Sequence, residues 1–232
     1  MAPTAATMRA ATIRFATRGT RVFRRTITTL PSNPHIKVFD NPSSPASYTL
    51  TYLDTKPPSQ NLAIGTTTTV PPTPHSFHEN HHFLDILNEV VTEHGHRDED
   101  VTNQARAFAS PGGFNLGSGG SFSPQKRPGR GASRKQGGGG GASAQGGAGG
   151  GGRGGWVHLS DRRNPPDFGR IAWPEDILGS VEVDESGQVV GRVQPSGTYR
   201  VVTNEGILGL SPFLREKLVE RLKEEEAKER VS

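Results

Sequence analysis

Two short runs of β-favourable residues near the start of the chain predict a hairpin. The runs are 35–39 (HIKVF) and 48–52 (YTLTY), and the spacer 41–45 (NPSSP) has the composition of a turn. The following residues, 55–74, are rich in Pro and Thr, which favour extended chain. The pattern therefore predicts one hairpin and then an extended segment.

The next stretch has helical periodicity. A helix is predicted over 77–94, with Ser76 and Glu79 as a capping box and Gly95 as its stop. Asp98 and the two acids after it favour a second helix start, and Ser110 with the Pro-Gly-Gly that follows favours its end. These two helices are expected to form a short antiparallel pair. The apolar stripes that carry the prediction are Phe83, Leu87, Val90, Val91 and His94, then Val101, Ala105 and Phe108.

The last 77 residues, from Trp156, alternate between short β-like runs and turns. Trp156–Leu159 is a β-like run, and 174–178 suits one helical turn. A three-stranded meander is predicted over 181–184, 189–193 and 198–202. Ser211 and Pro212 then begin a helix whose apolar stripe covers the sheet.

Together these elements predict an α+β protein. The expected units are a presequence over 1–27, a hairpin and two-helix module over 34–110, a disordered Gly-rich linker over 111–155, and a β-meander capped by a C-terminal helix over 156–232. The second module is expected to fold alone, with a cooperative melt.

Composition narrows the possible chemistry. Only 31% of the 232 residues are hydrophobic, and Gly and Pro together make up 48 of them, so much of the chain cannot form a core. There is no cysteine, which excludes disulfides, cysteine-ligated metals and thiol nucleophiles. No apolar run is long enough to predict a transmembrane helix.

The net charge of +4 is unevenly distributed along the chain. Residues 1–27 hold six Arg and no acid, and 111–155 hold six bases and no acid. The segments between and after them are acidic, with four bases against nine acids over 28–110 and eleven against fourteen over 156–232. The basicity therefore belongs to the two segments that are expected not to fold.

The first segment, MAPTAATMRAATIRFATRGTRVFRRTI, resembles a mitochondrial presequence, with Arg spaced among Ala and Thr and no acid before Asp40. Arg25-Thr26-Ile27 before Thr28 is similar to sites where the presequence processing peptidase leaves Arg three positions before the cut. The resemblance implies import into the mitochondrial matrix, with peripheral attachment to the inner membrane as a further option. The alternative is a basic arm that binds nucleic acid or acidic lipid.

Residues 78–82 read HENHH and satisfy the H-E-x-x-H pattern of zinc metalloproteases. Continuations that would supply a third ligand fail, because Asp85 and Asn88 stand where Gly and His would be needed. A metallohydrolase is therefore disfavoured. A metal site of His78, His82 and Asp85 is a weaker hypothesis, set against a solvent-facing polar cluster at a helix start. No cofactor is predicted.

The linker holds 20 of the 30 glycines and too little apolar surface to fold. It is interpreted as a tether. The alternative is loose contact with RNA, because Gly-Arg-Gly sequences occur in it. The residues that would contact RNA are Arg127, Arg130, Arg134 and Lys135.

No nucleophile and base occur at a recognisable spacing, so the sequence favours binding over catalysis. The main hypothesis is a non-catalytic accessory or assembly factor for a mitochondrial protein complex. The alternatives are a protein associated with the mitochondrial ribosome or RNA, and a His-cluster metal-binding protein. The residues expected to contact a partner are Trp156, Phe168, Trp173, Leu214 and Leu218.

Overall fold

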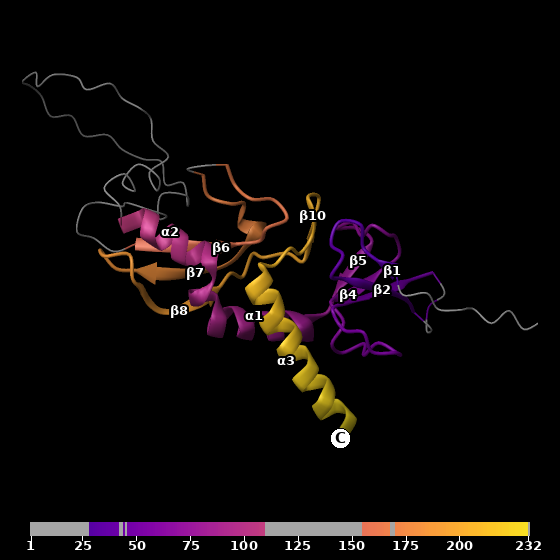
Figure 1. The fold of residues 1–232 in the computed structure, drawn as a ribbon. Helices are drawn as coiled ribbons and strands as arrows, with labels where there is room; N and C mark the ends of the chain where they lie inside the picture. Colours follow the sequence, from indigo (N-terminus) through magenta and orange to yellow (C-terminus); the bar gives the residue numbers. More distant parts are fainter. Residues whose placement is uncertain (1–27, 42–43, 45, 110–154, 168–169, 232) are drawn as a thin grey trace, which may run out of the picture.

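The computed structural model describes residues 28–41, 44, 46–109, 155–167 and 170–231, and its fold is α+β. Two antiparallel sheets lie at opposite ends of the molecule, and helices α1 and α3 lie between them (Figure 1). The predicted fold class is therefore confirmed. None of the helices in these ranges is long and apolar enough to cross a membrane.

The N-terminal sheet is a five-stranded meander in sequence order. The predicted hairpin is present as β2 and β3, with Val38 opposite Leu50. Strand β4 comes from the segment expected to be extended, and β5 comes from the start of the predicted helix. Gly65 lets β4 lie against β5, because a Cβ there would clash with the His78 carbonyl oxygen. The strands are β1 (Thr28–Thr29), β2 (Lys37–Asp40), β3 (Tyr48–Thr51), β4 (Gly65–Thr67) and β5 (Phe77–Glu79).

Helix α1 runs from His81 to His94, so the predicted start at 77 was wrong. Asn80 is the N-cap, and its side chain accepts a hydrogen bond from the amide of the second helical residue at 3.1 Å. Ser76 and Glu79 do not form a capping box. Ser76 closes a turn with Thr73, and the Glu79 carboxylate accepts from the Val201 amide at 3.1 Å. Residues 77–79 form a strand instead of the predicted helical turn because they pair with β4, and the local helical pattern does not report that partner.

Helix α2 runs from Glu99 to Ala109 and follows a short 3-10 turn, η1 (Gly95–Arg97). The expected antiparallel pair does not form: α1 packs on α3 and on strand β8, whereas α2 packs on β6. Asp98 has no exposed surface, and it joins the N-termini of two helices. Its carboxylate accepts from the amide of Asp100 in α2 and from the hydroxyl of Ser211, which caps α3.

The C-terminal sheet has the order β6-β7-β8. The β-like run predicted from Trp156 is the edge strand β6, and it takes the place of the strand predicted over 198–202. That prediction was wrong, because only Val202 of the range lies in a strand, which belongs to a separate pair. Val157 and Leu159 of β6 are buried like Val181 and Val183 of β7, which gives the sheet one apolar face for the helices. The elements are β6 (Gly155–Ser160), η3 (Pro174–Asp176), β7 (Ile177–Val183), β8 (Val189–Pro195), and a small separate pair of β9 (Val202–Thr203) with β10 (Gly206–Ile207).

Helix α3 runs from Pro212 to Val231. As predicted, Ser211 caps it, accepting from the Leu214 amide at 3.1 Å. The buried stripe of Leu214, Leu218 and Leu222 belongs to a single hydrophobic core that also takes residues from both sheets and from α1 and α2. The two predicted modules therefore share one core in the structure, and their independent folding stays a prediction.

Candidate functional site

Both ends of the segment that links β6 to β7 are held by a buried ionic network. The Arg163 side chain is 3% exposed, and its Nε donates to the Asp176 carboxylate at 2.7 Å. Its other guanidinium nitrogens donate to the carbonyl oxygens of Glu175, Arg200 and Val201 at 2.7–2.9 Å. One planar group therefore joins the end of this segment to the chain before β9.

Asp161 completes the network. Its carboxylate accepts from the Arg163 and Gly209 amides at 2.8 Å and from the Tyr199 hydroxyl at 2.7 Å. Burial raises the pKa of Asp161, and the Arg163 guanidinium opposes that shift. Burial also raises the pKa of Tyr199 well above its ordinary value, so Tyr199 remains a donor. These groups are enclosed, and they hold the backbone rather than face solvent.

Trp173 lies just before the second of these ends and is 68% exposed, the most exposed Trp, Tyr or Phe side chain among the described residues. Its backbone is held on both sides, because Ala172 is buried and the Trp173 carbonyl accepts from the Asp176 amide at 2.8 Å. Ile171, 48% exposed, lies two residues before it. A large apolar side chain is thus presented to solvent next to a hydrogen-bonded, partly buried stretch of backbone.

The other predicted contact residues lie elsewhere. Trp156 is 36% exposed and pairs with Glu182, which in turn faces Val190 across β7 and β8. Trp156 and its cross-strand neighbours lie near the turn between β7 and β8. Trp173 comes shortly before Ile177, the first residue of β7, and so lies near the other end of that strand. The two tryptophans therefore do not form one patch. Leu214 and Leu218 are core residues without exposed surface for a partner, and Phe168 lies outside the described residues.

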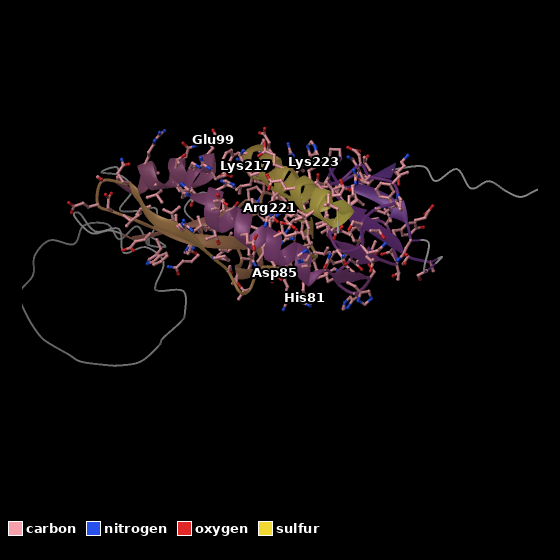
Figure 2. All side chains as sticks on the ribbon, turned by 90° about the horizontal axis from the view of Figure 1, so that it is seen from below. His81, Asp85, Glu99, Lys217, Arg221 and Lys223 are labelled. Atoms are coloured by element: carbon pink, nitrogen blue, oxygen red, sulfur yellow. The ribbon has the colours of Figure 1, made fainter. Side chains whose placement is uncertain are left out.

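The H-E-x-x-H residues do not form a metal-binding helix. His78 is on β5, opposite Thr66, while His82 is in the first turn of α1. The two imidazoles therefore do not lie one helical turn apart, and Asp85 projects from α1 close to His81 (Figure 2). Within the described ranges, no three His, Asp or Glu side chains come together as a metal site.

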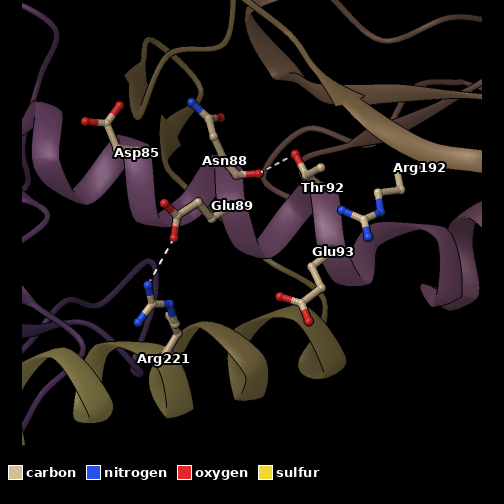
Figure 3. Close-up of a pocket in the computed structure, with 7 residues that line it drawn as sticks. All are labelled: Asp85, Asn88, Glu89, Thr92, Glu93, Arg192 and Arg221. Atoms are coloured by element: carbon tan, nitrogen blue, oxygen red, sulfur yellow. Dashed lines mark hydrogen bonds and ion pairs between the residues drawn. The ribbon is translucent and has the colours of Figure 1, made fainter.

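An open groove runs along α1 between β8 and α3 (Figure 3). Asp85, Glu89 and Glu93 line it at intervals of four residues, and Arg221 of α3 pairs with Glu89 at 3.1 Å. Arg192 of β8 adds the second cation. Small-molecule pockets are usually lined mainly by apolar side chains. This groove has only polar and charged side chains, so it differs from such pockets.

The expected presequence, 1–27, and the linker residues Arg127, Arg130, Arg134 and Lys135 lie outside the described part of the chain. The main feature that sequence reasoning missed is the Arg163 network. Asp161, Arg163 and Asp176 were visible only as charges in a polar loop and a helical turn, because their partners are brought together by tertiary structure. Comparison of the chain with protein-family models, curated proteins and solved structures gives no match.

Proposed function

We propose that this protein is an imported mitochondrial accessory or assembly factor that binds a partner protein through Trp173 and Ile171, and that it acts without catalysis. The observation that carries the proposal is the exposure of Trp173 on a backbone fixed by the Arg163 network. The location rests on the resemblance of residues 1–27 to a presequence.

The physical argument concerns the energy of binding. Tryptophan is enriched among interface residues that contribute most to affinity, because it buries a large area with few rotatable bonds. A side chain on a loose loop loses part of that gain to ordering. Here the Trp173 carbonyl is hydrogen-bonded to the amide of Asp176, whose carboxylate is paired with Arg163 in the folded protein, which favours a low ordering cost.

The test follows the native protein by antibody in sedimentation of gently lysed mitochondria, with and without ribonuclease. We expect co-migration with a large complex that ribonuclease does not disrupt. Trp173→Ala should move the protein to light fractions, because loss of a central tryptophan weakens such contacts by about 2 kcal/mol or more. Co-migration that ribonuclease abolishes would instead support the RNA-linked alternative.

Trp156→Ala is the matched control, since it removes the same side chain from the opposite end of the sheet. It should leave the sedimentation unchanged. The melting temperature of purified Trp173→Ala should equal that of the wild type, because the side chain is mostly in solvent. Equal sedimentation of both variants and the wild type would refute the role of Trp173.

A further inference from the structure

The outward face of the C-terminal sheet carries a serine between an imidazole and a side-chain amide. His158 of β6 is the cross-strand neighbour of Ser180 in β7, and Ser180 is the cross-strand neighbour of Gln194 in β8. Directly opposed residues of antiparallel strands project from the same face of the sheet, with their Cβ atoms close together. Val157 and Val181, which alternate with this row, are buried, so the row itself lies on the face away from the core.

His158 and Ser180 are joined by a hydrogen bond between side chains. The imidazole Nδ1 lies 2.7 Å from the Ser180 Oγ. With the ring proton on Nε2, Nδ1 accepts from the hydroxyl, which is the arrangement in which a base activates a nucleophile. Burial lowers the pKa of His158 below its ordinary value of 6.5, so the imidazole is neutral at pH 7 and its Nδ1 can take up a proton.

The row is open to a reactant from the side of β8. Ser180 is partly exposed, and Gln194 is exposed. An amide N–H group beside a nucleophile can donate to the oxygen that becomes negatively charged when a carbonyl carbon is attacked. Ser180 therefore lies between a proton acceptor on one strand and a hydrogen-bond donor on the other.

The next row on the same face supplies apolar surface. It consists of Trp156, Glu182 and Val190, and it lies two residues away from the first row on β6 and β7. Trp156 is 36% exposed and Val190 is 48% exposed. An apolar chain attached to a carbonyl carbon at Ser180 can therefore lie against these side chains.

We infer that Ser180 is a modification site that takes the acyl group of an activated ester, with His158 as the base and Gln194 as the donor to the oxyanion. The Ser180 Oγ attacks the carbonyl carbon while its proton passes to His158 Nδ1. The bond between that carbon and the leaving oxygen then breaks, and the leaving group takes the proton from His158. The product is an acyl-serine, formed once per chain, so the inference requires no turnover and does not depend on binding through Trp173.

The experiment treats the full-length protein with para-nitrophenyl hexanoate at neutral pH, and mass spectrometry of peptides identifies the acylated residues. Ser196 is the internal comparison, because it is also partly exposed but its Oγ is hydrogen-bonded to the Thr198 hydroxyl instead of an imidazole. A positioned base accelerates such reactions by about 100-fold or more, so Ser180 should be acylated at least about 100-fold faster than Ser196. Equal rates for the two serines would overturn the inference, and this comparison needs no variant.

His158→Gln tests the base, since glutamine cannot take up the proton at neutral pH. It should slow acylation of Ser180 by about 100-fold while its circular dichroism matches that of the wild type. His75→Gln is the matched control, because His75 is exposed and lies in the N-terminal half, and it should leave the rate unchanged. An unchanged rate in a folded His158→Gln protein would refute the role of the imidazole.

Gln194→Ala tests the donor to the oxyanion. It should slow acylation of Ser180 by about 10-fold, the loss expected for one hydrogen bond to a charged group. Gln188→Ala, at another exposed glutamine of the same half, should leave the rate unchanged. Equal rates in these two variants would refute the role of Gln194.

The length of the acyl group tests the apolar row. The hexanoate should react at least about 3-fold faster than para-nitrophenyl acetate, because the longer chain buries apolar surface against Trp156. Trp156→Ala should remove this preference. Ile171→Ala, at an exposed apolar residue near Trp173, should keep it. A preference that survives in Trp156→Ala would refute the contact between the acyl chain and the indole.

Discussion

Replacement of Arg163 by Lys tests whether the buried network holds the Trp173 segment. Lys keeps the positive charge between Asp161 and Asp176 but presents a single nitrogen in place of the planar fork. The guanidinium spans the Asp176 carboxylate and three backbone carbonyls, at distances of 2.7–2.9 Å. One ammonium cannot reach all four acceptors.

The expected loss follows from which acceptors are left without a donor. The buried Val201 carbonyl keeps the Leu208 amide as a donor at 2.9 Å, so the acceptor most affected is the Asp176 carboxylate, which is 1% exposed. The carbonyls of Glu175 and Arg200 belong to exposed residues, so water can replace the donor there. With a weakened bond to Asp176, Arg163→Lys should lower the free energy of unfolding by about 2–4 kcal/mol, and Arg163→Ala by about 3–5 kcal/mol.

Urea unfolding of the full chain measures this loss. With a slope of about 2 kcal/mol per M, a loss of about 3 kcal/mol moves the midpoint down by about 1.5 M. Arg200→Lys is the matched control, because the same substitution is then made at an exposed side chain, and it should change the free energy by less than about 0.5 kcal/mol. An Arg163→Lys midpoint equal to that of the control would refute the reasoning.

Three further predictions concern other parts of the fold. Burial lowers the pKa of His158 below its ordinary value near 6.5, so His158 takes up a proton in the unfolded chain before it does so in the folded protein as the pH falls. The free energy of unfolding should therefore decline from pH 7.5 to 5.5, and it should decline less steeply in His158→Gln. Equal slopes for the two proteins would contradict this. Gly187→Ala should destabilise the protein by at least about 1 kcal/mol more than Gly191→Ala, because both have positive φ but only the first Cβ would meet α2, at 2.5 Å. A double-mutant cycle of Asp98→Asn and Ser211→Ala should give a coupling energy of about 1–3 kcal/mol by urea unfolding, and additive losses would refute the link between the two helix caps.

Local signals were sufficient where an element depends on its own residues. The hairpin of β2 and β3, the cap of α3 by Ser211 and the stripe of Leu214, Leu218 and Leu222 follow from alternation, capping chemistry and helical spacing. The start of α1 did not follow, because Glu79 bonds to the Val201 amide 122 residues away, and no local pattern reports that partner. The Arg163 network was invisible for the same reason.

The same long-range contacts bear on how the chain is divided. The sequence suggested two modules because a Gly-rich segment separates them, yet the Leu stripe of α3 packs on α1 and the apolar face of β6 packs on α2. Residues 156–232 alone would expose both surfaces to water, and Asp98 would no longer be present to accept from the Ser211 hydroxyl. A Gly-rich composition indicates a segment that is not expected to join a core, but it does not indicate whether the segments on either side of it share one. The two halves therefore share one hydrophobic core in this structure. The position of the exposed Trp173 also depends on both halves, because the Arg163 network reaches the Val201 carbonyl and the Val201 amide donates to the Glu79 carboxylate of the N-terminal half.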